Sequence, residues 1–298
     1  MYHVSVMLGE TVGALNATAG KTYLDATLGG GGHTQAILNT GASVIAIDRD
    51  QVAIDYCKSH VVGDVKYIKG QYENAVKLLG DIGVGEIAGA VMDLGVSSKQ
   101  LDDAERGFSY MHDGALDMRM DRASELSAFD VVNGYSQEEL MRILRDYGEE
   151  SFYKRIAAAI VKRREQGEIK TTKQLADIIA ASVPYRKSGH PAKKSFQAIR
   201  IEVNGELKGL EKAIKGIFGL IERGGRLAII SFHSLEDRIV KTTFKDLATD
   251  CICPKSFPVC VCNHHAEGKL ISRERPTEIE LNNNPRSASA TLRVIEKL

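Results

Sequence analysis

The chain lacks the features that mark membrane-spanning and secreted proteins. None of its apolar runs approaches the roughly 18 residues that a membrane span requires. Its start, Met1-Tyr-His-Val-Ser5, has no basic stretch of the kind that opens a signal peptide. Five cysteines in 298 residues do not make a disulfide framework. These absences predict a protein of the reducing cytoplasm with no membrane partner. A chain of 298 residues is long enough for one domain that carries an insertion.

A net charge is also absent, because 39 Lys and Arg balance 39 acids. Taken alone, this balance disfavours a nucleic-acid partner. It hides an asymmetry, however: residues 101–150 carry 13 acids and 5 Lys or Arg, whereas residues 151–215 carry 15 Lys or Arg and 6 acids. Residues 183–201 contain five Lys or Arg together with His190, and no acid. This stretch predicts a local surface for a polyanion.

The most informative stretch that the chain does contain is Asp25-Ala-Thr-Leu-Gly-Gly-Gly-Gly-His33. It follows a predicted strand at 22–24, and the next predicted strand, 43–47, ends in Asp48. Glycines let the backbone turn sharply and approach a ligand closely. An acid at the tip of the following strand is typical of ribose binding in α/β folds. The combination predicts an adenosine-containing cofactor.

Three other interpretations of this glycine run are a dinucleotide site, a Walker loop and a tight turn without a ligand. The dinucleotide fingerprint needs a small residue where Thr34 or Gln35 stands, and no Gly-Lys-Ser/Thr follows as in a Walker loop. Asp25, ahead of the glycines, suits a ligand with a positive centre or an ammonium group. S-adenosylmethionine has both, so it is the cofactor that we expect.

The predicted elements divide the chain into an α/β sheet and a helical insertion. Alternating strands and helices indicate a parallel sheet, with strands predicted at 22–24, 43–47, 65–69, 89–92, 224–231 and 290–296. Between these groups the pattern is helical, at 137–147, 152–166, 172–181 and 195–218. Ser136 and Thr171 are the expected N-caps. We therefore predict a sheet domain formed by 1–110 and 215–298, and an insertion at 111–214 that recognises RNA.

Long strings after the fourth predicted strand carry a resemblance to a known family. They are Asp93-Leu-Gly-Val-Ser-Ser-Lys-Gln-Leu-Asp-Asp-Ala-Glu-Arg-Gly-Phe-Ser109, Leu116-Asp-Met-Arg-Met120, Phe196-Gln-Ala-Ile-Arg-Ile201 and Gly224-Gly-Arg-Leu-Ala-Ile-Ile-Ser-Phe-His-Ser-Leu-Glu-Asp-Arg238. The chain resembles the bacterial methyltransferases of the MraW/RsmH family, which modify cytosine N4 in small-subunit ribosomal RNA. The resemblance implies a class I, Rossmann-like methyltransferase fold and S-adenosylmethionine as donor. It also implies a cytidine of the decoding region as target, in ribosomal RNA or in the assembled 30S subunit.

The same resemblance implies the residues that contact the cofactor, namely Gly31, Gly32, His33, Asp48, Tyr72, Asp93 and Gln100. The first three would hold the methionine end, Asp48 would accept hydrogen bonds from the ribose hydroxyls, and Tyr72 would pack on adenine. Asp93 is also the expected catalytic residue, as the acceptor that hydrogen-bonds the amino group of the target base. Phe232 or Phe108 would stack on that base.

Two further groups of residues complete the expected site. One follows the strand predicted at 224–231, and the other is the basic stretch. Ser234 and Asp237 form a predicted capping pair, beside His233, which is more often structural than a base. Arg186, Lys187, Lys193 and Lys194 are the expected substrate contacts, because a basic loop given an RNA substrate binds phosphates. The alternative for this run is a solvated lysine-rich face.

Four of the five cysteines, Cys251, Cys253, Cys260 and Cys262, lie within twelve residues. They are either zinc ligands or reduced thiols of a loop. Structural zinc sites space paired cysteines by about two to four residues, whereas here the spacing is one. The prediction is therefore no metal centre, with zinc as the alternative.

Two other functions compete with the methyltransferase. A nucleotide-dependent oxidoreductase is disfavoured by the failed fingerprint. A non-catalytic ribosome-assembly factor that binds RNA and retains a cofactor pocket is disfavoured by the intact Gly31–His33, Asp48 and Asp93. The oligomeric state is open, with a homodimer among the alternatives.

Overall fold

The computed structural model describes residues 5–184, 189–254 and 259–298, and the chain divides into two compact units. The first unit joins Met1–Gly95 to Gly209–Leu298, and the second is Val96–Lys208. The second unit begins before the expected boundary at residue 111, because Val96, Leu101 and Phe108 pack in its hydrophobic core. It ends at Lys208, before the expected residue 214.

The first unit is built on a seven-stranded sheet with the order β3-β2-β1-β4-β5-β7-β6. Neighbouring strands among β1 to β5 run parallel, and β7 is antiparallel to both β5 and β6. The strands are β1 (Thr22–Asp25), β2 (Ser43–Asp48), β3 (Val65–Lys69), β4 (Ile87–Asp93), β5 (Ile221–Ser231), β6 (Gly268–Glu274) and β7 (Thr291–Lys297). This sheet confirms the predicted α/β class. The strand order reverses between β1 and β4, and that switch point is where open α/β sheets bind ligands.

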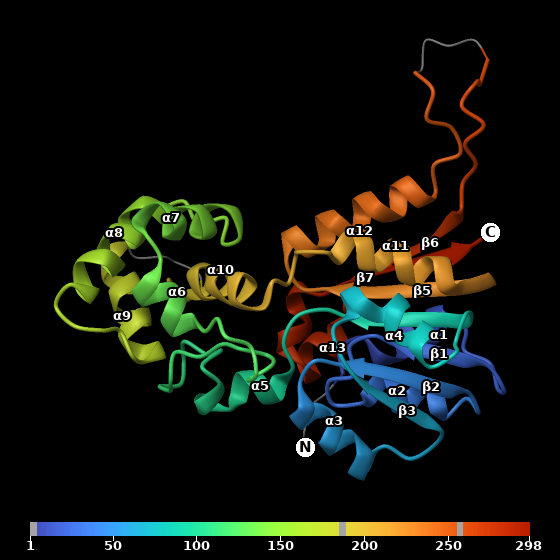
Figure 1. Cartoon of the computed structure of the whole chain (residues 1–298), viewed down its shortest axis with the longest axis horizontal. Helices are drawn as coiled ribbons and strands as arrows, with labels where there is room; N and C mark the ends of the chain where they lie inside the picture. Colours follow the sequence, from blue (N-terminus) through green and yellow to red (C-terminus); the bar gives the residue numbers. More distant parts are fainter. Residues whose placement is uncertain (1–4, 185–188, 255–258) are drawn as a thin grey trace. The chain divides into compact units, whose positions relative to one another are not determined.

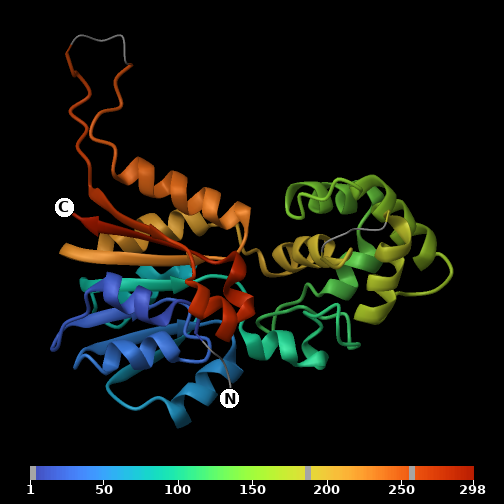
Figure 2. The same ribbon diagram turned by 180° about the vertical axis from the view of Figure 1, so that it is seen from behind.

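Helices cover both faces of the sheet, which is why its strands are apolar along most of their length (Figures 1 and 2). One face packs against α1 (Leu8–Leu15), α2 (Gly32–Leu38) and α3 (Gln51–His60). The other packs against η1 (Tyr72–Asn74), α4 (Ala75–Asp81), α11 (Leu210–Leu220) and α12 (Ser234–Leu247). The short α13 (Glu278–Asn283) and η3 (Pro285–Ser289) precede β7. In the parts of the chain that the structure describes, no helix is long and apolar enough to cross a membrane.

The second unit is helical around a core of its own. Its elements are α5 (Ser98–Asp102), η2 (Ala104–Arg106), α6 (Ala128–Gly134), α7 (Gln137–Asp146), α8 (Tyr153–Arg164), α9 (Thr172–Ser182) and α10 (Lys193–Asn204). Leu140, Ile156 and Leu175, from three successive helices, are fully buried together. Burying an aliphatic side chain contributes about 1.5–3 kcal/mol. Ser136 and Thr171 cap α7 and α9 in reciprocal capping boxes, so these two predictions are confirmed.

The single helix predicted over 195–218 is wrong. The structure has two helices there, α10 and α11, separated at two glycines with left-handed backbone conformations. Gly205 has φ 62° and ends α10, whereas Gly209 has φ 82° and precedes α11. A residue with a Cβ rarely adopts such angles, so the glycines stop the helix even though the apolar periodicity continues. The boundary between the units, Lys208–Gly209, falls in this break.

Candidate functional site

The glycine loop connects β1 to α2 at the switch point of the sheet. Gly31 has φ 76° and is the N-cap of α2, which begins at Gly32. A Cβ on Gly31 would lie 2.6 Å from Cγ2 of Val61 and 2.9 Å from Sγ of Cys57, and one on Gly32 would collide with the Ser5 hydroxyl. Glycine is therefore required here by the packing of the protein itself as well as by any approaching ligand.

The Asp25 carboxylate hydrogen-bonds to residues on both sides of the glycines instead of facing a ligand. It is buried at the end of β1, where the Thr34 hydroxyl donates to Oδ2 at 2.7 Å and the Thr27 N–H donates to Oδ1 at 3.1 Å. Burial raises the pKa of Asp25 to about 6, against the opposing effect of these hydrogen bonds. The role that the sequence suggested for Asp25, facing a positive centre, is not supported, because both of its carboxylate oxygens accept hydrogen bonds from Thr27 and Thr34.

Asp48 lies at the tip of β2, as the sequence predicts, and its carboxylate holds two backbone segments. The Gly29 N–H donates to Oδ2 and the Asp50 N–H donates to Oδ1, both at 2.8 Å. Each carboxylate oxygen can accept a second hydrogen bond. Asp48 can therefore accept both hydroxyls of a ribose without releasing the loop. Burial raises its pKa.

Asp93 ends β4, directly beside the loop. Its backbone N–H donates to the Thr27 hydroxyl at 2.6 Å, and its Oδ2 lies 3.8 Å from Nδ1 of His33. Its Oδ1 is buried and has no hydrogen-bond partner among the described residues. Burial, reinforced by the charges of Asp25 and Glu236, raises the pKa of Asp93 well above its ordinary value. A buried acceptor without a partner costs about 1–3 kcal/mol, so this oxygen is ready for a donor on a ligand.

Tyr72 lies in η1, just after β3, where the sequence places it. Its ring is 8% exposed and packs in the core beneath α11. The guanidinium carbon of Arg49 lies 5.6 Å from the ring centroid. The ring therefore has a cationic neighbour on the side of β2, within the range of a cation–π contact. Its stacking on adenine stays a prediction.

The remaining expected contacts to cofactor and RNA belong to the second unit. In α5, Gln100 forms a capping box with Ser97, whose N–H donates to the Gln100 amide oxygen at 3.0 Å. Lys193 and Lys194 are the first two residues of α10, and the Lys194 ammonium donates to the Glu149 carbonyl at 2.8 Å. Arg186 and Lys187 lie outside the described residues.

The predicted capping pair of Ser234 and Asp237 is wrong by one residue. His233 is the N-cap of α12, and its Nδ1 accepts the Glu236 N–H at 3.4 Å. Asp237 instead forms a bidentate ion pair with Arg293 of β7, at 2.8 and 3.0 Å. The His233 imidazole is buried against Glu236, which supports the structural role that the sequence favoured.

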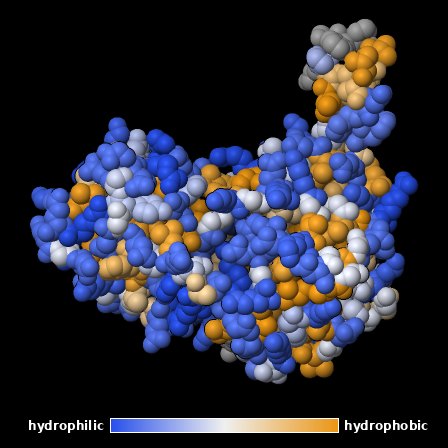
Figure 3. Space-filling model, in the orientation of Figure 1, coloured by the Kyte–Doolittle hydropathy of each residue, from blue (hydrophilic) through white to orange (hydrophobic). Residues whose placement is uncertain are grey.

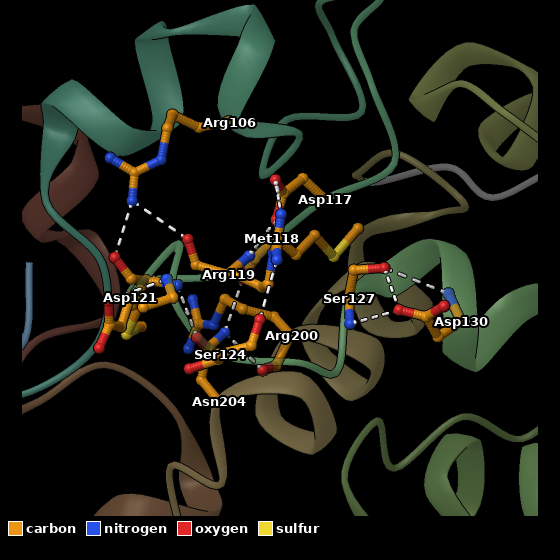
Figure 4. A network of polar contacts seen from close by, with 12 residues as sticks. Arg106, Asp117, Met118, Arg119, Asp121, Ser124, Ser127, Asp130, Arg200 and Asn204 are labelled. Atoms are coloured by element: carbon orange, nitrogen blue, oxygen red, sulfur yellow. Dashed lines mark hydrogen bonds and ion pairs between the residues drawn. The ribbon is translucent and has the colours of Figure 1, made fainter.

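Two of the strings that carry the family resemblance meet in one polar network of the second unit (Figure 4). Asn204 accepts the Met120 N–H at 2.7 Å and donates to the Met118 carbonyl at 2.7 Å, where Met118 has φ 59°. Arg119 pairs with Asp117 at 2.7 and 3.0 Å, and Arg106 donates to the Arg119 and Met120 carbonyls. These signature residues hold the backbone of a long loop.

The sequence profile of the MraW methylase family matches residues 1–298. The chain belongs to this family. Ribosomal RNA small subunit methyltransferase H of Clostridium botulinum is 47% identical over 305 residues, which cover 99% of each chain. The protein of the same name from Clostridioides difficile is 48% identical over 308 residues, which cover 100% of this chain and 99% of its own. A solved rRNA methylase from Streptococcus thermophilus aligns over 99% of this chain at 12% identity and a TM-score of 0.42, so the assignment rests on the sequence relatives.

Membership of the methylase family confirms the resemblance read from the strings. Sequence reasoning missed one residue of this candidate site, Thr27, which connects the end of β1 to Asp93. Its position between Asp25 and the glycines is the only signal that could have indicated it, because hydroxyls beside a strand tip often bond to nearby backbone.

Proposed function

We propose that this chain transfers the methyl group of S-adenosylmethionine to N4 of a cytidine in the decoding region of small-subunit ribosomal RNA. The observation that carries the proposal is Oδ1 of Asp93, a buried acceptor without a partner, next to the glycine loop at the switch point of a methylase sheet. S-adenosylmethionine is the cofactor of this methylase, and the acceptor base is the part of the proposal that needs its own test.

The residues at the sheet edge fit the donor. Gly31 is the N-cap of α2, and Gly32 and His33 are its first two residues, where the backbone N–H groups and the helix dipole favour the carboxylate of a methionine moiety. Asp48 offers one lone pair on each oxygen to the two ribose hydroxyls. Burial is the main cause of the raised pKa values of Asp48 and Asp93. A cationic sulfonium centre close by would favour the ionised form of these buried carboxyls.

Asp93 fits the needs of an amino-group acceptor. The lone pair of cytosine N4 is delocalised into the ring, so the nitrogen must pyramidalise before it attacks the methyl carbon. A carboxylate oxygen that accepts an N4–H hydrogen bond stabilises that geometry. The N4–CH₃ bond forms as the S–CH₃ bond breaks, the sulfonium becomes a thioether, and N4 loses one proton. A carboxylate with a raised pKa is suited to receive that proton.

The RNA side of the proposal is supported by the names of the relatives and by charge. Both relatives described above are named as small-subunit rRNA methyltransferases. Lys193 and Lys194 stand in the first turn of α10, where the helix dipole disfavours cations. Lysines at such a position are stabilised by an anion brought by a partner, and RNA phosphates are anions of that kind.

The deciding experiment maps methylated cytidines in small-subunit rRNA from cells that lack this protein, complemented with wild type or with Asp93→Ala. We expect one N4-methylcytidine in the decoding region to disappear in the deletion, to return with wild type and to stay absent with Asp93→Ala. Restored methylation with Asp93→Ala would show that methyl transfer does not require Asp93. An unchanged cytidine map in the deletion strain would contradict the proposed substrate and favour a non-catalytic assembly factor.

A further inference from the structure

The segment between α12 and β6 extends away from the sheet as two arms (Figure 1). Its base is fastened by the Glu267 N–H, which donates to the Leu247 carbonyl at 2.8 Å. Beyond the base, Ile252, Val259 and Val261 are 63%, 71% and 67% exposed, and Figure 3 shows apolar colour on this projecting part of the molecule. None of the hydrophobic clusters of the described residues includes these arms. Their pairing therefore needs something other than apolar burial.

The four clustered cysteines meet between the two arms, two from each. Sγ of Cys260 lies 3.5 Å from Sγ of Cys251, 4.0 Å from that of Cys253 and 3.5 Å from that of Cys262, and the Cys262 and Cys251 sulfurs are 3.8 Å apart. All four sulfurs lie within 4.8 Å of one another. A tetrahedron with Zn–S bonds of about 2.3 Å has edges of about 3.8 Å. The four measured edges are close to that value.

Backbone N–H groups surround the sulfurs. The Cys253 N–H donates to Sγ of Cys251 at 3.4 Å, and the Val261 N–H donates to Sγ of Cys253 at 3.3 Å. The N–H groups of Ile252 and His264 face Sγ of Cys262. Donors arranged in this way stabilise thiolates, which are the form of cysteine that binds a metal.

We propose that Cys251, Cys253, Cys260 and Cys262 bind one Zn²⁺ ion as a tetrahedral four-thiolate site. In the sequence, the one-residue spacing within each cysteine pair argued against zinc. The geometry of the folded chain removes that objection. Each Cys-x-Cys pair contributes two sulfurs from one arm, and the two pairs face each other across the gap. A tetrahedral set of four sulfurs selects zinc or iron among the common metals, and zinc needs no redox partner.

A disulfide pairing explains the arrangement less well. The shortest sulfur–sulfur separations are 3.5 Å, against about 2.05 Å for a bond. Sγ of Cys260 lies at that same separation from two different cysteines, so no pairing is singled out. A zinc ion binds all four sulfurs at once. It therefore joins the two arms, which lie outside the hydrophobic clusters of the described residues.

The test measures metal in the full chain, purified without chelators from zinc-supplemented cells. We expect about one zinc per chain by mass spectrometry of metals, and its loss in Cys253→Ser and in Cys260→Ser. Cys57→Ser is the matched control that retains zinc, because Cys57 is buried in α3 and belongs to no metal cluster of the described residues.

A second readout is independent of any variant. Replacement of the metal by Co²⁺ in the wild-type chain should give the visible absorption of a tetrahedral thiolate complex, and chelation should release four thiols to a thiol reagent. A zinc-free wild-type chain with four reactive thiols would overturn the proposal. So would iron in place of zinc, disulfides at these cysteines, or zinc retained in both serine variants.

Discussion

Gly29 and Asp48 are joined by a hydrogen bond of 2.8 Å from the Gly29 N–H to Oδ2 of Asp48. The tip of β2 therefore holds the loop that follows β1, and the acid expected to grip a ribose is also a structural support for the glycine run. We therefore expect one carboxylate to couple ligand affinity to loop conformation. A substitution of Asp48 should act on both.

Asp48→Ala removes two carboxylate oxygens, which accept hydrogen bonds from the Gly29 and Asp50 N–H groups and are the expected acceptors for the ribose hydroxyls. Hydrogen bonds to charged groups contribute about 1.5–3 kcal/mol, so the Kd for S-adenosylhomocysteine should rise at least about 10- to 150-fold. Isothermal titration calorimetry measures it. Asp81→Asn is the control, because Asp81 is an exposed acid of α4 paired with Lys77. Equal affinity of Asp48→Ala and this control would refute the ribose role.

Asp93→Asn should make the protein more stable at neutral pH while it impairs methyl transfer. The pKa of Asp93 is raised in the folded state, chiefly by burial. The folded protein thus binds a proton that the unfolded chain has released, and stability falls as the pH rises from the unfolded pKa, about 3.9, through the folded one. Asparagine carries no charge, so the variant's advantage in Tm over wild type should grow across that pH range.

Thermal unfolding of wild type and Asp93→Asn at a series of pH values checks this prediction. Asp130→Asn is a contrasting control, because hydrogen bonds from Ser127 lower the pKa of Asp130 and its ionised form is stabilising. The control should lose stability relative to wild type as the pH rises. A pH-independent difference in Tm for Asp93→Asn would show that its carboxyl is not the buried acid described here.

Gly31→Ala should destabilise the first unit by about 1–3 kcal/mol, the usual cost of overpacking. The added Cβ meets Val61 and Cys57 at less than 3.0 Å, and φ at this position is 76°. Gly80→Ala is the matched control, since Gly80 lies in α4 with open space around it, and alanine there favours the helix. Denaturant unfolding compares the two. An equal midpoint for both variants would contradict the crowding at Gly31.

The five parallel strands and the acids at their carboxyl ends were predictable because their signals are local, whereas β6 was not predicted and β7 is antiparallel in a sheet expected to be parallel. Three of the first four predicted strands are short apolar runs, whereas 65–69 contains two lysines, and Asp48 and Asp93 directly follow two of the apolar runs. The capping boxes at Ser136 and Thr171 were predictable for the same reason. In each case a few adjacent residues determine the outcome.

The other features depend on contacts between residues that are far apart in the sequence, and no local pattern reveals such contacts. The start of the second unit at Val96 depends on Leu101 and Phe108, which pack in the same core as helices much later in the chain. Asp25 was assigned to a ligand because nothing in the sequence shows that Thr34 takes its carboxylate. The sulfur cluster likewise depends on the approach of two arms, whereas spacing alone argued against it.

Charge reversal at Lys193 and Lys194 should weaken RNA binding and reduce its dependence on salt. Each phosphate contact contributes about 0.7 (single strand) to 0.9 (duplex) to the slope of log K against log salt, so losing two should lower it by roughly 1.4–1.8. The double variant Lys162→Glu/Lys208→Glu is the control, because it makes the same change in net charge at exposed positions of the second unit. Titration of a small-subunit rRNA fragment at several salt concentrations separates the two: a local contact changes the slope only for the first pair. Identical slopes for both double variants would mean that α10 acts through overall charge, and that the phosphates bind elsewhere.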